Sequence, residues 1–323
     1  MIPSEEKKLL IKIAQMYYEQ DLTQSQISKE LGIYRTTISR MLKTAREKGI
    51  VKISIQYDTE ETYTYEETIK NRFGLKHVIV VPIEAEQPEK SRLKAMGQAS
   101  ARFIRNILKD NDIIGFSWGS SLAEMVNEIQ TLDKKNIICI PMVGGPSGVL
   151  ESRYHVNTIC YNASLKLHGN SVMIDVPAIV GKKETRNDII QSNHFQEIAK
   201  LWNQINIAIF GIGSANITSK ASWSAFYGDA IIKELEEGKV VGDICSRFFD
   251  ALGNQVNTSI YDRTISIQLD VLKKTRYSIG IAESAEKVSA IIGALNGGYL
   301  NVLVTTEDTA RQIVEHTKDY EKR

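Results

Sequence analysis

The sequence predicts an α/β protein with a small N-terminal helix-turn-helix domain and a large second domain built on a mainly parallel sheet. Three observations support this class. The first fifty residues have helical periodicity, the rest alternates apolar runs with helical stretches, and an excess of positive charge is confined to the N-terminal part. The 323 residues, 42% hydrophobic and 24% charged, suit an ordinary globular protein of two or three domains. We expect the domains to be 1–56 and 57–323.

The N-terminal segment has the spacing of three short helices. Apolar residues at helical intervals predict a helix over 4–20, and Thr23 is a good N-cap for a second helix that ends near Leu31. Gly32 suits the tight turn before a third helix over 34–48. Two short helices joined by a glycine-containing turn form the helix-turn-helix pattern, in which the second helix enters the major groove of DNA.

The third helix is followed by the signals of a helix end and a short strand. Gly49 stands at the C′ position, where glycine commonly terminates a helix. The following IVKISIQY alternates apolar and polar residues, which predicts a strand and hence a winged type of helix-turn-helix domain.

Charge and register together make the third helix a candidate DNA-binding helix. Residues 1–55 contain ten Lys or Arg and six Asp or Glu, whereas the remainder contains thirty and thirty-three, so the net charges are +4 and −3. A solvated bundle helix is the alternative, but the outward face combines hydroxyls with long cations, which suit bases and phosphates. The predicted DNA contacts are Gln24, Ser25, Tyr34, Arg35, Thr36, Thr37, Ser39, Arg40, Lys43 and Arg46.

Tyr34 is unusual because its position calls for an N-cap residue such as Ser, Thr or Asp. Two interpretations are open. The ring lies over a sugar-phosphate, or it packs against the turn and staples it.

The second domain is predicted to begin with a helix in TYEETIKNRFGL and to continue as strand–helix repeats. The predicted strands are 77–83, 112–117, 136–145, 172–180, 205–213, 277–282 and 301–306. The predicted helices between them include 91–108, 121–130, 186–202 and 285–295. Near-continuous apolar strands that alternate with helices favour a parallel sheet covered on both faces.

Ligands of such sheets bind at the carboxyl ends of the strands. Three loops at these ends are rich in glycine and serine: the loop of GFSWGSSLAEMV, VGGPSG over 143–148, and GIGSAN over 211–216. Backbone N–H groups at the start of a helix can cradle an anion. Because glycines also serve tight turns, one loop alone is weak support, but three together predict a phosphate or polyol ligand.

Other chemistries lack their motifs. GIGSAN lacks the third glycine of the dinucleotide fingerprint, the five histidines have no zinc spacing, and G-x-S-x-G is absent. We therefore expect no cofactor and no metal. The sequence also lacks a signal peptide or membrane span, and its three scattered cysteines suit a reduced cytoplasmic compartment.

The stretch from IAQMYYEQDLTQ to AREKGIV, with GFSWGSS, GGPSG, ESRYHVNT, GIGS, GDICSRFFD and YSIGIA in this order, resembles the SorC (sorbose-operon regulator) family. These are sugar-responsive bacterial transcription regulators, and the resemblance covers nearly the whole chain. It is strongest to the sorbose-regulating members, in which Tyr also occupies the position of Tyr34; elsewhere in the family Ser is usual there.

The resemblance implies a regulator of a sugar operon, sorbose-related, that binds operator DNA and a phosphorylated sugar. Its second domain would resemble ribose-5-phosphate isomerase, glucosamine-6-phosphate deaminase and CoA-transferases in fold. A homo-oligomer, commonly a tetramer, is also implied.

Motif matching implies which residues hold the effector. The implied phosphate contacts are Ser117, Trp118, Gly119, Ser120, Ser121 and Lys287. The residues implied to line the sugar are Gly144, Gly145, His155, Asn157, Gly213, Ser214 and Asp243. Alternatives remain for two of them, since His155 suits a purely structural role and Asp243 suits a helix cap. Lys287 also makes sense unaided, because a cation after a strand end neutralises a phosphate.

A phosphosugar isomerase or deaminase with an added nucleic-acid-binding module is the second interpretation. It requires a pair of catalytic carboxylates, which the sequence does not present convincingly. We therefore expect a regulator and not an enzyme.

Overall fold

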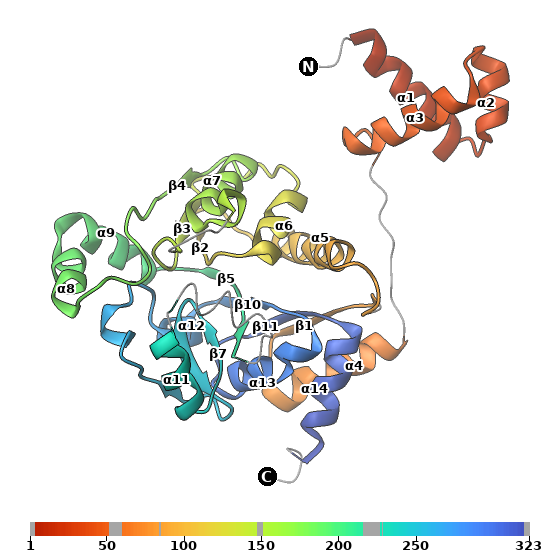
Figure 1. The fold of residues 1–323 in the computed structure, drawn as a ribbon. Helices are drawn as coiled ribbons and strands as arrows, with labels where there is room; N and C mark the ends of the chain where they lie inside the picture. The colour runs from red at the N-terminus through yellow and green to blue at the C-terminus, as the bar shows by residue number, and fades with distance from the viewer. Residues whose placement is uncertain are drawn as a thin grey trace. The chain divides into compact units, whose positions relative to one another are not determined.

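The computed structural model describes residues 4–51, 60–83, 85–146, 151–215, 227 and 229–319. The chain divides into two compact units, Met1–Tyr57 and Asp58–Arg323 (Figure 1). Each unit has its own hydrophobic core. No helix in the described part of the chain is long and apolar enough to cross a membrane.

The N-terminal unit contains the three helices that the sequence predicts. They are α1 (Ser4–Tyr18), α2 (Gln24–Leu31) and α3 (Arg35–Glu47). Their inner faces supply the buried apolar residues Leu10, Ile13, Ala14, Met16, Ile27, Ile38, Leu42 and Ala45. The strand predicted after Gly49 lies outside the described residues from residue 52 onward.

The boundaries of α2 follow from its caps. The Thr23 hydroxyl accepts a hydrogen bond from the Gln26 backbone N–H at 3.3 Å, and the Gln26 side chain accepts from the Thr23 N–H at 2.8 Å. These two bonds form a capping box, which satisfies backbone donors that the first turn leaves open. Gly32 ends α2 in the left-handed conformation with φ 66°, and Gly49 follows α3 with φ 69°. The predicted turn and termination are thus confirmed.

Thr23→Ala is expected to destabilise α2 locally by about 1 kcal/mol, because it removes the capping hydroxyl. Amide hydrogen exchange over residues 24–31 of the full chain should therefore accelerate. Thr64→Ala, a change of an exposed threonine in the other unit, is the control. Unchanged exchange in Thr23→Ala would show that the box contributes nothing to α2.

The large unit is built on a seven-stranded sheet in which all neighbouring strands are parallel. In spatial order the strands are β1 (His77–Val81), β11 (Val302–Thr306), β10 (Tyr277–Ile281), β5 (Ile207–Gly211), β2 (Ile113–Phe116), β3 (Ile138–Pro141) and β4 (Asn170–Ser171). The predicted parallel sheet is therefore confirmed.

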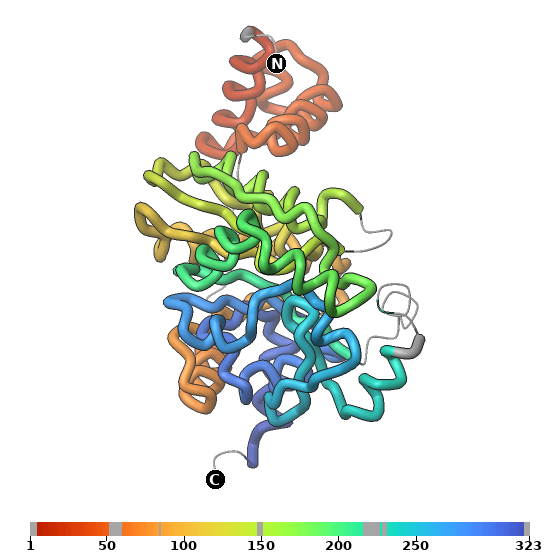
Figure 2. The backbone as a smooth tube through the Cα atoms, turned by 90° about the vertical axis from the view of Figure 1, so that its left-hand side faces the viewer, coloured from red at the N-terminus to blue at the C-terminus, as the bar shows by residue number. Residues whose placement is uncertain are grey.

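Helices cover both faces of this sheet (Figures 1 and 2). One core includes residues of α5 (Glu89–Ile107), α6 (Ser120–Glu128) and α7 (Val156–Lys166). The core on the other face includes residues of α4 (Glu60–Phe73), α9 (Asn193–Trp202), α12 (Leu269–Lys274), α13 (Val288–Asn296) and α14 (Glu307–His316). The 3₁₀ turns η1 (Ser152–Tyr154), η2 (Tyr261–Arg263) and η3 (Ala285–Lys287) precede or join these elements.

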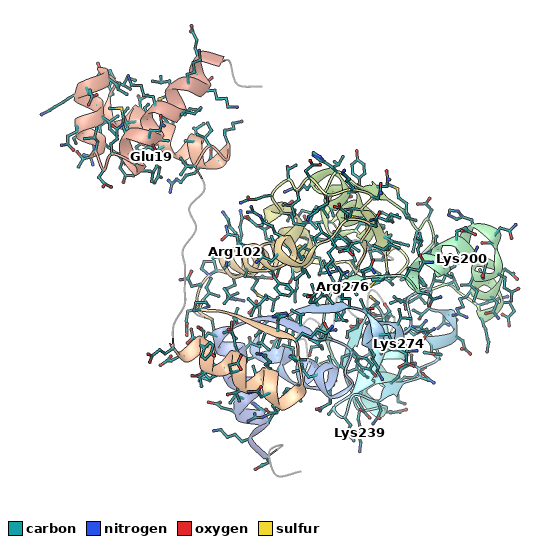
Figure 3. The ribbon with its side chains drawn as sticks, turned by 180° about the vertical axis from the view of Figure 1, so that it is seen from behind. Glu19, Arg102, Lys200, Lys239, Lys274 and Arg276 are labelled. Atoms are coloured by element: carbon teal, nitrogen blue, oxygen red, sulfur yellow. The ribbon has the colours of Figure 1, made fainter. Side chains whose placement is uncertain are left out.

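The strand order reverses between β2 and β5. From β2 the chain proceeds to β3 and β4 in one direction, and from β5 it proceeds to β10 and β11 in the other. Ligands of open parallel sheets bind at the carboxyl ends of the strands beside such a reversal. At the opposite edge, an ion pair of 2.6 Å joins Arg276 (Figure 3), which precedes β10, to the buried Asp112, which precedes β2.

Two predictions in this unit are wrong. The segment 172–180 forms only isolated bridges and no strand. One reason is that the side-chain amide of Asn157 forms hydrogen bonds with both the N–H and the C=O of Ile174. Another is that Pro177 has no N–H to donate. The single helix predicted over 186–202 is two, α8 (Lys183–Gln191) and α9. Ser192 separates them, since its hydroxyl accepts from the Phe195 N–H and caps α9.

The sequence prediction also missed a second, antiparallel sheet that follows β5. It contains β6 (Gly213–Ser214), β7 (Val240–Ile244), β8 (Arg247–Asp250) and β9 (Gln255–Val256), with α11 (Asp229–Glu237) leading into β7. β6 begins two residues after β5 ends, so this sheet lies directly at the carboxyl end of the central strand. It carries Asp243 to that position.

Candidate DNA-binding surface and effector site

The apolar and polar faces of α3 are placed as the helical wheel predicts. Ile38, Leu42 and Ala45 are at most 3% exposed, and Met41 is half-buried. The exposed residues on the remaining surface are Arg35, Thr36, Ser39, Arg40, Lys43, Arg46 and Glu47, whereas Thr37 is half-buried. Ser25 is exposed and Gln24 half-buried in the first turn of α2.

Cations dominate the exposed surface of α3. Lys43 forms a 3.9 Å pair with Glu47, the acidic residue in the last turn of the helix, and both side chains are more than half exposed. Such a solvated i,i+4 pair is weak and releases its lysine at little cost. The surface is therefore suited to an anionic partner.

The structure tests one of the two interpretations of Tyr34, the one in which the ring staples the turn. The residue is the N-cap of α3, yet it makes no side-chain capping bond. Its side chain is 85% exposed, so it does not pack against the turn. The staple interpretation is wrong.

In the large unit, the loops after β2 and β5 are joined. The Ser117 backbone N–H donates to the Ile209 carbonyl at 3.1 Å, and the Ser117 hydroxyl accepts from the Gly211 N–H at 3.3 Å. Ser117 is 4% exposed, so its side chain positions the loops more than it offers a free ligand contact.

The start of α6 is open toward this edge. Gly119 is its N-cap with φ 126°, a conformation that essentially only glycine adopts, and no side chain caps the turn that begins with Ser120 and Ser121. The Gly119 N–H donates to the Tyr154 carbonyl at 3.2 Å, which ties this loop to the segment before α7. Open N–H groups at a helix start favour an anion.

Four of the predicted residues meet where the two sheets join. Gly213 pairs with Asp243 across β6 and β7, and the Ser214 hydroxyl donates to the Glu286 carbonyl at 2.8 Å, directly before Lys287. Asp243 and Lys287 are both half-buried and close enough for their charges to interact. The site thus places a cation and a carboxylate within range of each other's charge, near the ends of β5 and β10.

Burial sets the ionisation of this pair. Burial raises the pKa of Asp243 to about 6, although the hydrogen bond from the Ser246 N–H (2.9 Å) and the charge of Lys287 oppose the rise. Burial lowers the pKa of Lys287, and the nearby acids Glu283 and Asp243 partly offset this effect. The alternative that Asp243 caps a helix is wrong, because its carboxylate accepts in the turn between β7 and β8.

Asp243→Asn is expected to stabilise the fold at pH 7.5 by about 3 kcal/mol, since burial raises the pKa of Asp243 from 3.8 to about 6 and each unit of pKa shift corresponds to about 1.4 kcal/mol. The wild-type pKa lies above the ordinary value, so the wild type should gain stability as the pH falls through 6 toward 4. The variant should lack this gain. Urea unfolding at pH 7.5 and 4.5 measures it, and the same pH dependence in both proteins would contradict the buried carboxylate.

A second group of predicted residues lies after β3. The His155 Nδ1 accepts from the Asn157 N–H at 3.2 Å and caps α7, while burial lowers the ring pKa and favours the neutral form. The Nε2 faces Gly145, where a Cβ would lie 2.8 Å away. At Gly144 a Cβ would lie 2.6 Å from the Pro177 carbonyl oxygen. These glycines allow the backbone to approach closely.

His155 therefore has the structural role that the sequence left open, since its Nδ1 caps α7. Its Nε2 is the ring nitrogen that remains for a ligand. Asn157 differs, because its amide already holds Ile174 through bonds of 3.1 and 3.2 Å. A structural role accounts for its side chain. The two groups of predicted residues are linked through the Gly119–Tyr154 bond.

Sequence reasoning missed an ion pair beside Lys287. Arg92 Nε lies 3.2 Å from both carboxylate oxygens of Glu283, and Arg92 Nη1 donates to the Ala85 and Gln87 carbonyls. The Arg92 guanidinium thus neutralises much of the negative charge of the Glu283 carboxylate. It also ties the loop after β1 to the loop after β10.

The loop after β10 repeats the geometry of the loop after β2. Ser284 has φ 113°, close to the value of Gly119, and each residue stands three positions after its strand ends. A non-glycine residue in this region is strained, and such strain concentrates at functional sites. In GFSWGSS and GIAESAE, Gly119 and Ser284 occupy the same position relative to the preceding strand. This equal spacing is visible in the sequence and could have indicated the second loop.

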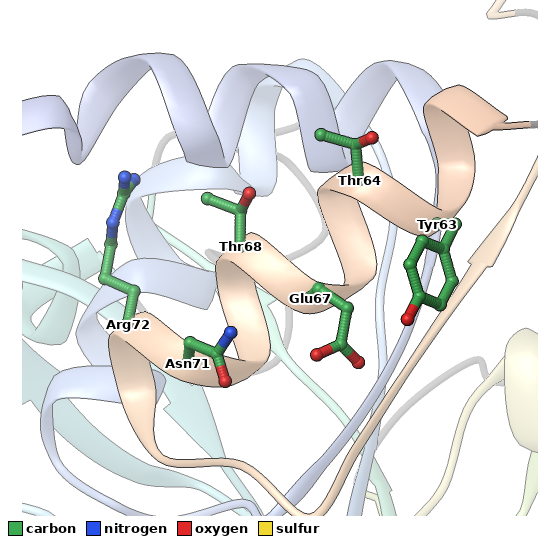
Figure 4. A pocket seen from close by; sticks show the side chains of 6 residues that line it. All are labelled: Tyr63, Thr64, Glu67, Thr68, Asn71 and Arg72. Atoms are coloured by element: carbon green, nitrogen blue, oxygen red, sulfur yellow. The ribbon is translucent and has the colours of Figure 1, made fainter.

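A groove of about 550 Å³ lies elsewhere, along α4 (Figure 4). Its lining residues are Tyr63, Thr64, Glu67, Thr68, Asn71 and Arg72. None of the predicted effector residues lines it. No group of three or more His, Cys, Asp or Glu side chains within the described ranges could hold a metal ion.

The chain is similar to known regulators over nearly its whole length. A sugar-binding domain family matches residues 57–315, and a winged helix-turn-helix DNA-binding family matches residues 13–52. The sorbitol operon regulator of Klebsiella pneumoniae is 47% identical over 97% of this chain and 99% of its own length. The crystal structure of the full-length regulator, SorC, matches with a TM-score of 0.81 over 97% of this chain and 100% of that chain.

The chain belongs to the SorC family. The deoxyribonucleoside regulator of Bacillus subtilis, 32% identical over 96% of this chain and 98% of that protein, is a further relative. A transcriptional regulator from Streptococcus pneumoniae, 32% identical, matches with a TM-score of 0.76 over 80% of this chain and 98% of that chain. These relatives are regulators, and this SorC-family protein is a DNA-binding transcription regulator and not an enzyme.

The comparisons do not confirm the expected link to sorbose. The Klebsiella relative is named for a sorbitol operon, which the predicted link to sorbose does not match. The winged helix-turn-helix fold and the sugar-binding domain are confirmed.

Proposed function

We propose that this regulator binds operator DNA through the exposed face of α3 and senses a phosphorylated sugar or polyol at the carboxyl ends of β2, β5 and β10. One observation supports the effector site above others. The open start of α6 and the cation Lys287 lie on loops that flank the end of β5, where the strand order reverses. An open helix start and a cation both suit phosphate.

The carboxylate of Asp243 supplies what a polyol requires. Its oxygens accept hydrogen bonds from hydroxyl groups, whereas a second phosphate there would be repelled. We therefore place the phosphate toward α6 and Lys287 and the hydroxyls toward Asp243, with the His155 Nε2 as a further contact. A phosphorylated hexitol of the sorbitol type fits this order of groups.

We further propose that the chain works in the cytoplasm as a homo-oligomer, a tetramer with paired DNA-binding domains, with the domain boundary at residues 56 and 57. Effector binding changes operator affinity only if the effector prefers one arrangement of the oligomer over another.

Calorimetric titration of the purified protein with a panel of ligands tests the site. The panel contains sorbitol 6-phosphate, sorbose 1-phosphate, glucose 6-phosphate, the three unphosphorylated sugars and inorganic phosphate. A phosphorylated sugar or polyol should bind at least tenfold more tightly than its unphosphorylated form, because charge-assisted bonds to phosphate are strong. Equal affinity for both forms would remove the phosphate from the proposal.

A further inference from the structure

The Tyr34 side chain is the most exposed of the large apolar side chains in the described part of the chain, at 85%. It makes no hydrogen bond and no ring contact with any described residue. Its backbone, at φ −56° and ψ 137°, is extended as an N-cap requires. The fold therefore gains nothing visible from the ring.

The same domain shows what an optimised cap looks like. Thr23, the N-cap of α2, forms both bonds of a capping box. At α3 the corresponding position holds a tyrosine, which leaves the first turn without a side-chain acceptor. A side chain that neither caps its helix nor forms a hydrogen bond or ring contact with the described residues breaks a local sequence preference without a gain to the fold, which is expected at functional sites.

The location indicates which contact this is. In helix-turn-helix proteins the first residues of the second helix reach base edges in the major groove. Arg35 and Thr36, the next exposed residues, offer polar groups for bases or phosphates. An apolar ring offers something different, since the apolar group that DNA presents in the major groove is the C5 methyl of thymine.

We propose that the Tyr34 ring contacts the C5 methyl of a thymine in each operator half-site and so determines specificity at that base pair. This inference rests on the proposed binding of operator DNA by α3. The ring carries the contact, and the phenolic hydroxyl is dispensable for it.

The test combines protein variants with thymine-to-uracil scanning of the operator, which removes one methyl group at a time. The operator is first located by footprinting of wild-type protein on the DNA upstream of its own gene. Affinities of the full-length wild type, Tyr34→Ser and Tyr34→Phe are then measured by fluorescence anisotropy at fixed salt. Tyr18→Ser, which removes a tyrosine of α1 that is 36% exposed and contacts the Tyr17 ring, is the control for loss of a tyrosine elsewhere in the same domain.

Tyr34→Ser should weaken operator binding about tenfold, as expected for loss of one base contact. Tyr34→Phe and Tyr18→Ser should bind like the wild type. One uracil position per half-site should weaken the wild type several-fold and have no further effect on Tyr34→Ser, because the two changes remove the same contact. Hydrogen exchange in the first turn of α3 should become slower in Tyr34→Ser, since serine restores a cap.

Three results would overturn the inference. Wild-type affinity of Tyr34→Ser removes the contact altogether. If Tyr34→Ser weakens operator binding but no thymine-to-uracil change is coupled to it, the ring contacts the DNA backbone and not a base. Faster hydrogen exchange in α3 of Tyr34→Ser assigns it a structural role. If the wild type binds no DNA, the proposed operator binding itself fails, which is a distinguishable outcome.

Discussion

Lys287→Ala is expected to leave operator affinity unchanged and to raise the effector concentration for a half-maximal response by at least tenfold. The side chain is half-buried between the loops after β5 and β10, and the Glu283 charge beside it is already bound by Arg92. Loss of a charge-assisted bond to phosphate costs about 1.5–3 kcal/mol, which corresponds to roughly 10–150-fold in affinity. Anisotropy of labelled operator during effector titration gives both quantities.

Two controls separate the cation from general damage. Lys287→Arg keeps the charge and should retain most of the response, whereas Lys200→Ala, an exposed change on α9, should behave like the wild type. Because Lys287 lowers the pKa of Asp243, its removal should also shift the titration of Asp243 to higher pH. A Lys287→Ala protein that responds at wild-type effector concentrations would exclude Lys287 from the site.

The second large effect is expected from Arg40→Ala combined with Lys43→Ala. Both side chains are exposed on α3, so their removal should not unfold the domain. Operator affinity should fall at least about thirtyfold, since each base contact is worth about 1–3 kcal/mol and the double variant removes two. If both cations contact phosphates instead, the slope of log affinity against log salt should drop by about 1.8, which corresponds to two released counterions.

The comparison protein for this double variant is Lys12→Ala, an exposed cation of α1 in the same domain. It should reduce affinity little at physiological salt. If the double variant binds no more weakly than Lys12→Ala, α3 is not the helix that contacts DNA.

The three helices of the N-terminal unit were predicted because their signals are local. Apolar residues three and four positions apart fixed the buried face of α3, and Thr23, Gly32 and Gly49 marked helix ends within one residue. The position of the Tyr34 ring could not be read from the sequence. The residue preferences of the N-cap position indicate where the helix begins. They do not indicate where the side chain points when it forms no capping bond.

The effector site was predicted in composition but not in geometry. Loops after β2, β3 and β5 are visible as glycine-rich breaks after apolar runs. The structure places their described parts, up to residue 146 after β3 and residue 215 after β5, on one sheet edge. The ion pair between Arg92 and Glu283 joins residues 191 positions apart, and no local pattern encodes such a contact. Ser117 was correctly placed, but its burial and its bond to Gly211 depend on the neighbouring strand.

Long-range interactions also explain the wrong strand over 172–180, and short strands explain why the second sheet was missed. The apolar run over 172–180 has strand-like composition, but Asn157 takes the backbone groups of Ile174 that a ladder would need. The strands of the second sheet have two to five residues each, too short for a clear alternation. Asp243 therefore could not be distinguished from a helix cap until its partner strands were known.

The most direct test of the coupling between effector and DNA is one reciprocal measurement. Operator affinity is determined with and without the ligand that binds most tightly in the calorimetric panel, and the affinity for that ligand is determined on free and operator-bound protein. The proposed mechanism predicts the same factor in both directions, roughly 5–150-fold, because coupling between two sites is reciprocal. A factor of one in both directions would contradict it, since DNA and sugar would then bind to one chain without communicating.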